Sequence, residues 1–161
     1  MKRSAEISEC GRYRYSLDRR WGDGDSVTFI MLNPSTADAN KDDPTIRRCI
    51  GFAKSWGYDG LVVRNLFALR STDKLALTKE SNPTGGDDHV LEAKKAKLII
   101  AAWGTFLPFN RERFVHWEFR STPLYCLKKT KNGQPWHPLY VSASATPIPF
   151  NESAMTARRL E

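Results

Sequence analysis

The stretch VTFIMLNPSTAD, residues 27–38, decides the fold of this chain. Six mostly apolar residues that favour β-structure, 27–32, run directly into the turn residues Asn33, Pro34 and Ser35. An apolar run of this length that ends in turn residues predicts a buried strand. Because ligands of open parallel α/β sheets bind beyond the carboxyl ends of the strands, we expect a catalytic or ligand-binding loop at residues 33–38.

Three further apolar runs, residues 61–67, 97–103 and 123–127, also predict strands. Helices are predicted between them, and Asp43 is placed to cap the first one, which begins at Pro44. Four strands that alternate with three helices predict an α/β protein with three layers, in which helices cover both faces of a four-stranded, mainly parallel sheet. The period-two alternation of residues 12–18 adds an N-terminal strand or hairpin with a structural role.

The length of 161 residues, 40% of them hydrophobic, favours a single domain over residues 1–159. Leu160 and Glu161 are interpreted as a vector-derived remnant and set aside. The longest apolar run, residues 98–103, is too short to span a bilayer, and no apolar segment follows the basic N-terminal residues. We therefore expect a soluble, cytoplasmic protein that does not enter a membrane.

The composition limits the chemistry that the chain can carry. Its three cysteines are far apart and form no Cys-x-x-Cys pair, and His89 and His116 have no companions with metal-ligand spacing, so we expect no metal and no cofactor. The formal net charge of +7 favours an anionic partner, of which nucleic acid is the commonest for a small domain. The sequence indicates no oligomeric state.

Chemically capable side chains follow each predicted strand. Asn33, Asn65, Trp103 and His137 all fall at or just beyond an outgoing strand end. Because the carboxyl ends of parallel strands lie along one edge of a sheet, these four residues should converge. This convergence is the main structural inference from the sequence.

The order of these motifs resembles the uracil-DNA glycosylase superfamily. In that family the first strand ends in Gly-x-Asp-Pro or Gly-x-Asn-Pro, the slot that residues 31–34 occupy here. The second strand has a glycine, four apolar residues and an asparagine that grips the base, a spacing that residues 60–65 reproduce. The third strand ends in Trp-Gly, as residues 103–104 do, and the last loop begins with His-Pro, as residues 137–138 do.

The chain as a whole is more similar still to the domain-of-unknown-function 1643 family. The similarity is carried by the segments MLNPSTAD, DDPTIRR and HPLY, at residues 31–38, 42–48 and 137–140. The name of that family implies no activity. A function therefore follows only from the remoter resemblance.

The resemblance to the glycosylases, and to their mismatch-specific branch, implies hydrolysis of an N-glycosidic bond through a transition state with oxocarbenium character. Asn33 would hold the attacking water, Asn65 would pair with the edge of the base, and His137 would donate to a base oxygen as negative charge develops there. An amide cannot accept the proton of water, so a slow enzyme is expected unless Asp38, Asp42 or Asp43 approaches the site as an auxiliary acidic residue.

Several positions of the expected site depart from the family. Met31 replaces the glycine of the first motif, and Leu139-Tyr140 stands where the family has Ser-Pro-Leu-Ser, a shortening that suits a free nucleoside or nucleotide as the substrate. Ser35 stands where a tyrosine of the family excludes the methyl group of thymine, and no aromatic residue directly follows Asn33. Ser35 and Phe67 are the candidates to complete the base-binding site, with Phe67 in the stacking role. Five cations are candidate contacts to a nucleic-acid backbone: Arg47, Arg48, Lys128, Lys129 and Lys131.

Simpler interpretations exist for several of these motifs. Residues 33–36 are also a common turn composition, and His137 before a proline is commonly a surface residue. The five cations also suit solvated surfaces. Three functions therefore stay open: a DNA base N-glycosylase, a hydrolase of a free nucleoside or nucleotide, and a non-catalytic module that binds nucleic acid or nucleotide.

Overall fold

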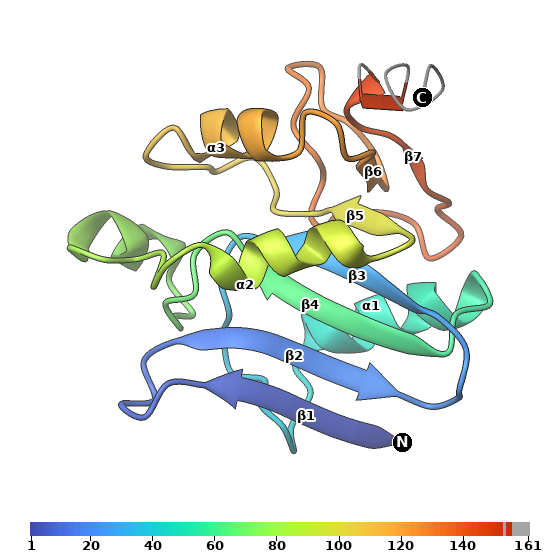
Figure 1. Cartoon of the computed structure of the whole chain (residues 1–161), viewed down its shortest axis with the longest axis horizontal. Helices are drawn as coiled ribbons and strands as arrows, with labels where there is room; N and C mark the ends of the chain where they lie inside the picture. The colour runs from blue at the N-terminus through green and yellow to red at the C-terminus, as the bar shows by residue number, and fades with distance from the viewer. Residues whose placement is uncertain (153, 156–161) are drawn as a thin grey trace.

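Within the residues that the computed structural model describes, 1–152, 154 and 155, seven strands form one sheet (Figure 1). Their order across the sheet is β1-β2-β4-β3-β5-β6-β7. The strands are β1 (Lys2–Ile7), β2 (Arg14–Arg20), β3 (Ser26–Met31), β4 (Gly60–Asn65), β5 (Ile99–Ala101), β6 (Tyr125–Cys126) and β7 (Ile148–Pro149).

The sheet is mixed, with β4, β3, β5 and β6 parallel to one another in its centre. The outer strands β1, β2 and β7 pair in antiparallel fashion. The predicted α/β class is thus present, and β2 overlaps the N-terminal strand predicted at residues 12–18. The sheet has seven strands in place of the four central strands and the N-terminal strand or hairpin that were expected, because β1 is polar and β7 has only two residues, so neither has a pattern that predicts a strand.

Three α-helices and three 3₁₀ helices are described: α1 (Pro44–Ser55), α2 (Asp88–Leu91), α3 (Arg111–Glu118), η1 (Lys74–Lys79), η2 (Glu92–Lys95) and η3 (Pro138–Tyr140). The first helix begins as the sequence predicts, since Pro44 is its first residue and the Asp43 side chain accepts a hydrogen bond of 2.9 Å from the Ile46 N–H.

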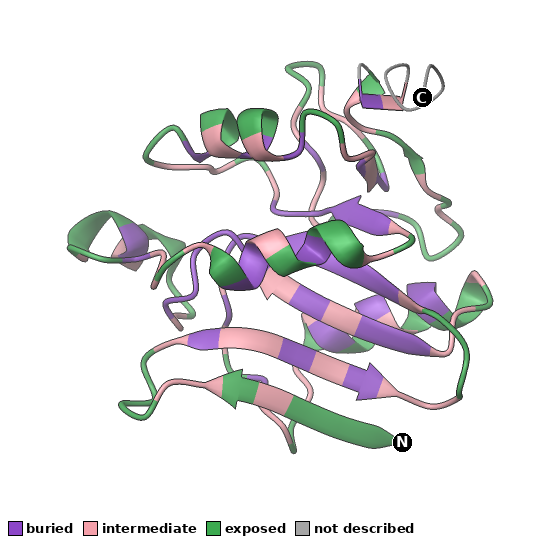
Figure 2. Ribbon diagram, viewed as in Figure 1, coloured by how far each residue is buried: buried purple, intermediate pink, exposed green. Residues whose placement is uncertain are grey.

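The two faces of the sheet bury different sets of side chains. Along the chain, buried residues concentrate in the central strands, whereas β1 at the edge is largely exposed (Figure 2). Val27, Phe29 and Met31 of β3 join one core cluster together with Phe52 of α1. Ile30, between them in sequence, points to the opposite face and belongs to a second cluster with residues of α2, η2 and α3. Residues of α1 therefore pack on one face, and residues of α2, η2 and α3 on the other (Figure 1).

The glycine that begins β4 allows a close approach between the two central strands. A Cβ atom on Gly60 would lie only 2.2 Å from Ser26 Oγ, so a larger residue would force β3 and β4 apart. The parallel register that follows sets Gly60 beside Ser26 and Asn65 beside Met31. Asn65 thereby reaches the same edge of the sheet as Asn33, which follows β3 by two residues.

Among the described helices, none has the length and apolar character required to cross a membrane. The pair Leu160-Glu161, which the sequence analysis set aside, lies outside the described residues.

Candidate functional site

A cavity of about 640 Å³ opens at the carboxyl ends of β3, β4 and β5. The chain leaves β3 for β4 on one side and later returns to β5 on the other, so the order of strands reverses at β3. Ligands of open α/β sheets bind at such a reversal. The start of α1 and the segments 71–74, 103–106 and 136–140 complete the wall.

Asn65 is the most informative residue in this wall. Its side chain is buried, with the residue only 1% exposed, and its Oδ1 has no hydrogen-bond partner in the described chain. Its backbone carbonyl, by contrast, accepts a hydrogen bond of 2.9 Å from His89 Nε2. Since buried polar groups are almost always paired, the Oδ1 of Asn65 offers an acceptor to a ligand or a water in the cavity.

Asn33 also lines the cavity, and its amide nitrogen ties together two loops. Nδ2 donates to the carbonyls of Pro34 and Ser71 at 3.1 and 3.0 Å and to that of Leu69 at 3.4 Å. These bonds fix the orientation of the amide. The group left for a ligand or a water is the acceptor Oδ1, which has no partner among the described residues.

His137 lines the same cavity from the segment that precedes η3. Its Nδ1 accepts a hydrogen bond of 3.2 Å from the Leu139 N–H, so the neutral ring carries its proton on Nε2. Burial lowers the pKa of His137, partly opposed by the charge of Asp43, and this favours the neutral form. The ring is therefore a fixed donor through Nε2.

The Trp103-Gly104 motif meets the His137 segment directly. Gly104 has φ +85°, a conformation that suits glycine, and a Cβ atom built on it would lie 3.8 Å from the Cβ of His137. Trp103 also lines the cavity and is 3% exposed. All four residues that the sequence analysis expected at one edge thus contribute to one cavity wall.

Of the three candidate auxiliary acids, the structure brings only Asp43 to the cavity. Its Oδ1 caps α1, which leaves Oδ2 for other contacts. Asp38 accepts bonds of 2.8 and 2.9 Å from the N–H groups of Asn40 and Lys41, and these hydrogen bonds lower its pKa. Asp42 is paired with Arg19 at 2.8 Å.

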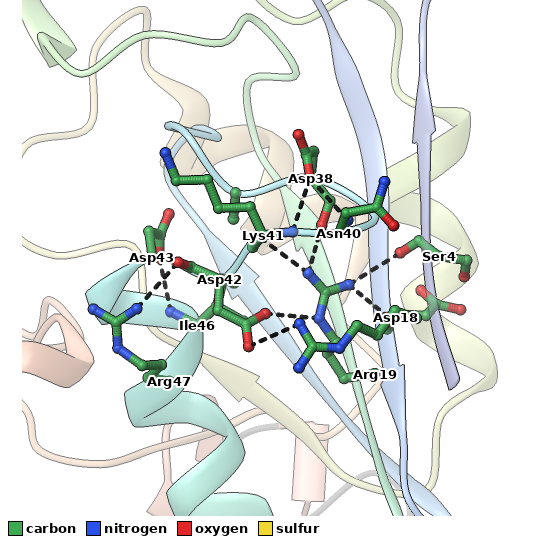
Figure 3. A network of polar contacts seen from close by, with 12 residues as sticks. Ser4, Asp18, Arg19, Asp38, Asn40, Lys41, Asp42, Asp43, Ile46 and Arg47 are labelled. Carbon is green, nitrogen blue, oxygen red and sulfur yellow. Dashed lines mark hydrogen bonds and ion pairs between the residues drawn. The ribbon is translucent and has the colours of Figure 1, made fainter. Parts of the chain in front are cut away.

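The loop that carries these acids is held by Arg19, which is fully buried at the centre of a polar network (Figure 3). Besides the bond to Asp42, its guanidinium donates to the carbonyls of Asp38 and Lys41. Five hydrogen bonds of this one side chain join β1, β2 and the loop 38–42. The network fixes the approach of the chain to Asp43.

Of the two residues expected to complete the base-binding site, only the hydroxyl residue lies at the cavity; the aromatic one does not. Ser35 lines the cavity as predicted, but Phe67 does not: it is fully buried in the core cluster of α2 and α3. The sequence analysis chose Phe67 for its aromatic ring and not from a strand pattern, and Phe67 lies two residues beyond the end of β4. Phe106, which the sequence analysis did not consider, lines the cavity in its place.

The five candidate phosphate contacts lie outside the cavity wall. Arg47 is exposed and donates to the Asp42 carbonyl. Arg48 donates to the carbonyls of Pro138 and Val141, so it supports the segment that carries His137. Lys128 lies over the ring of Trp136 and Lys129 over that of Phe150, while Lys131 is exposed on the same loop.

Sequence analysis missed two cations of the cavity, Arg14 and Lys74. Arg14 begins β2, which pairs antiparallel with β4, so the start of β2 lies beside the end of β4. The only feature of the sequence that could have pointed to Arg14 is its position within the alternating residues 12–18. Within residues 1–152, 154 and 155, no three side chains of His, Cys, Asp or Glu gather as a metal site.

These features define an α/β protein with a cavity of polar and apolar side chains at the carboxyl edge of its parallel strands. A family model described as "Protein of unknown function (DUF1643)" matches residues 14–139, and the chain belongs to this family. The comparison with curated proteins found no match, and neither did the comparison with solved structures.

Proposed function

We propose that this protein binds a nucleobase in the cavity and hydrolyses the N-glycosidic bond of a damaged or mismatched base in DNA. We further propose that its central strands and covering helices correspond to the three-layer fold of the uracil-DNA glycosylase superfamily. The observation that carries the proposal is the buried, unpaired amide of Asn65 in a wall shared with Asn33 and His137.

A nucleobase suits the amide of Asn65 because the edge of a base carries both hydrogen-bond donors and acceptors. The Oδ1 of Asn65 lacks a donor, which a ring N–H or an amino group would supply, and the amide NH₂ can donate to a neighbouring base oxygen or nitrogen. Phe106 offers a ring at the cavity wall, and stacking of a base on an aromatic side chain is worth about 1–3 kcal/mol.

Hydrolysis requires a water that attacks the anomeric carbon and a group that takes its proton. In our proposal the water donates to Asn33 Oδ1, and Asp43 Oδ2 accepts its proton as the C–O bond forms. Asp43 is chosen because it lines the cavity, whereas Asp38 and Asp42 are held by the network around Arg19. A carboxylate in this place supports a hydrolase over a non-catalytic module.

The departing base takes the electron pair of the C–N bond and becomes an anion. His137 Nε2–H would donate to a base oxygen as this charge develops, and the neutral ring is suited to the task because Nδ1 is fixed as an acceptor. Protonation of the base then completes the reaction. No residue in this scheme requires a metal or a cofactor.

Two exposed apolar side chains at the mouth of the cavity support a strand of DNA as the substrate. Leu139 and Tyr140 directly follow His137-Pro138, line the cavity, and are 43% and 74% exposed. Enzymes that act on a base must remove it from the stack, and an apolar side chain can fill the space that it leaves.

The proposal is tested by incubating the protein with oligonucleotides that contain uracil, hypoxanthine or mismatched bases, and with free nucleosides, and measuring the base released. We expect release from at least one oligonucleotide. Asn33→Ala, Asp43→Asn and His137→Gln should each slow it by about 100-fold or more, the usual range for a lost acid–base or oxyanion contact. No release from any substrate would refute the hydrolase.

Salt separates the substrate classes in the same assay. If several phosphates of a strand are neutralised, the affinity should fall steeply between about 50 and 200 mM salt. Activity confined to free nucleosides, with an affinity that salt barely changes, would replace the DNA glycosylase by the alternative nucleoside hydrolase. Salt-sensitive binding without release of a base would favour the non-catalytic module.

A further inference from the structure

Arg14 is a buried cation in the cavity wall that the proposed chemistry does not use. It is 2% exposed and lines the cavity together with Asn65. Its Nη1 donates to the carbonyl of Ala37 at 2.9 Å, whereas its Nε has no hydrogen-bond partner. Burial lowers the pKa of Arg14 to about 10, so the guanidinium remains charged at neutral pH.

No carboxylate in the described chain forms an ion pair with Arg14. Asp43 and Asp73 also line the cavity, but each uses Oδ1 to cap the start of a helix, at Ile46 N and Leu75 N. The charge of Asp43 acts on Arg14 only from beyond ion-pair distance. An unpaired buried charge is costly, so the site favours an anion that supplies the counter-charge.

Lys74 brings a second cation to the same cavity. It is exposed, its Nζ lies 5.4 Å from the centre of the Phe106 ring, and it has no ion pair among the described residues. Arg14 thus lies deep in the wall and Lys74 at the mouth, with the hydroxyl groups of Ser35 and Thr72 in the same wall. Two cations with hydroxyl groups around them match the donors that phosphate prefers.

We propose that this part of the cavity is a subsite for the phosphate group of a nucleotide, held by Arg14 from inside and by Lys74 from the mouth. The inference rests on the proposed function, because a phosphate beside a base site identifies the ligand as a nucleotide. The phosphate belongs either to a free nucleotide or to a DNA strand, and competition between the two distinguishes these sources.

The experiment measures binding of inorganic phosphate and of ribose 5-phosphate, with ribose as the uncharged control, by the shift in unfolding temperature and by calorimetry. We expect both phosphates, but not ribose, to stabilise the protein. Arg14→Gln should weaken phosphate binding by about tenfold or more and Lys74→Ala by a few-fold. Lys79→Ala is the matched control, because Lys79 is exposed on the same 3₁₀ helix but does not line the cavity.

Absence of phosphate binding to the wild-type protein, or equal binding by Arg14→Gln, would overturn the inference. Should Arg14→Gln fail to fold, Arg14→Lys supplies the comparison: it keeps the charge but loses the planar fork, so binding should weaken by less than in a neutral variant. In that case equal binding by wild type, Arg14→Lys and Lys74→Ala would overturn it.

Two competitors of bound phosphate then assign the source. Displacement by a nucleoside 5′-monophosphate alone indicates a free nucleotide, and displacement by an oligonucleotide without terminal phosphates indicates a strand; both support the subsite. Phosphate binding without any binding or release of a base would leave the subsite intact and remove the proposed function. Base release without phosphate binding would support the proposed function and overturn the phosphate subsite.

Discussion

Two asparagines of this protein show how differently an amide can be used. Asn151 is saturated: its Oδ1 accepts from Leu124 N at 2.6 Å, and its Nδ2 donates to the carbonyls of Phe119 and Thr122. Asn65 has an unpaired, buried Oδ1. The first amide stabilises the fold, whereas the second costs stability, as expected of a group kept for a ligand.

Replacing each amide by leucine should separate these roles. Asn65→Leu removes an unsatisfied buried group, so the free energy of unfolding should stay the same or rise by about 1 kcal/mol, while base-dependent activity is lost. Asn151→Leu removes three hydrogen bonds and should cost about 2–4 kcal/mol. Urea unfolding measures both, and a large loss of stability in Asn65→Leu would contradict the assignment of Asn65 to a ligand.

The buried imidazoles predict how stability depends on pH. Burial lowers the pKa of His89 and of His137, so below about pH 6.5 the unfolded chain binds more protons than the folded one. The free energy of unfolding should therefore be greatest above that pH and decline as the pH falls toward about 5. Urea unfolding measured at several pH values across this range tests the predicted decline in the free energy of unfolding. His89→Gln, which can still donate to the Asn65 carbonyl, should decline less, and an unchanged decline would contradict the assignment.

At the scale of elements, the loop between β3 and α1 depends on one side chain from β2. Arg19 is fully buried and contacts Asp42 and the carbonyls of residues 38 and 41 (Figure 3). Arg19→Met should destabilise the protein by about 3 kcal/mol, because it removes five hydrogen bonds and leaves the largely buried Asp42 carboxylate paired only with the more exposed Arg3, at 3.5 Å. Thermal or urea unfolding of the wild type and of Arg19→Met measures this loss in the free energy of unfolding.

A double-variant cycle isolates the ion pair. Adding Asp42→Leu to Arg19→Met removes the carboxylate that has lost its closer partner, so the pair of substitutions should cost less than the sum of the two single ones. Additive costs would show that the carbonyl contacts of Arg19, and not its charge on Asp42, hold the loop.

The segment of η3 is held by α1 through Arg48, which donates to the carbonyls of Pro138 and Val141. Arg48→Gln should displace His137 and lower kcat by about tenfold, since small misplacements of catalytic groups are costly, with a smaller effect on KM. Arg47→Gln is the matched control, because Arg47 is exposed and contacts only its own loop. Equal effects of both substitutions on KM and on salt sensitivity would favour phosphate contacts in place of a positioning role.

At the scale of the whole molecule, the features that could be predicted from the sequence are local ones. The helix cap at Asp43 involves atoms three residues apart, and the strands β3 and β4 are mainly apolar runs that lead to Asn33 and Asn65. The shared cavity of Asn33, Asn65 and His137 follows from these runs once the strands are taken as parallel.

The features that escaped prediction depend on long-range pairing. The side on which β2 joins the sheet is set by packing, and only that pairing puts Arg14 beside the end of β4. Phe67 was proposed for the site because it is aromatic, but tertiary packing buries its ring in the core cluster of α2 and α3. Phe106 belongs to a loop without periodicity, so no pattern in the sequence could place its ring at the cavity.

The central claim, that a base enters the cavity and is held by Asn65, is tested most directly with two otherwise identical oligonucleotides. One carries a 2′-fluorinated nucleotide whose glycosidic bond resists cleavage, with the base identified by the release assay, and the other carries a tetrahydrofuran residue without a base. We predict that the wild-type protein binds the first about tenfold or more tightly, and that Asn65→Leu abolishes the difference. Equal affinities in the wild type, or an undiminished difference in Asn65→Leu, would contradict the account.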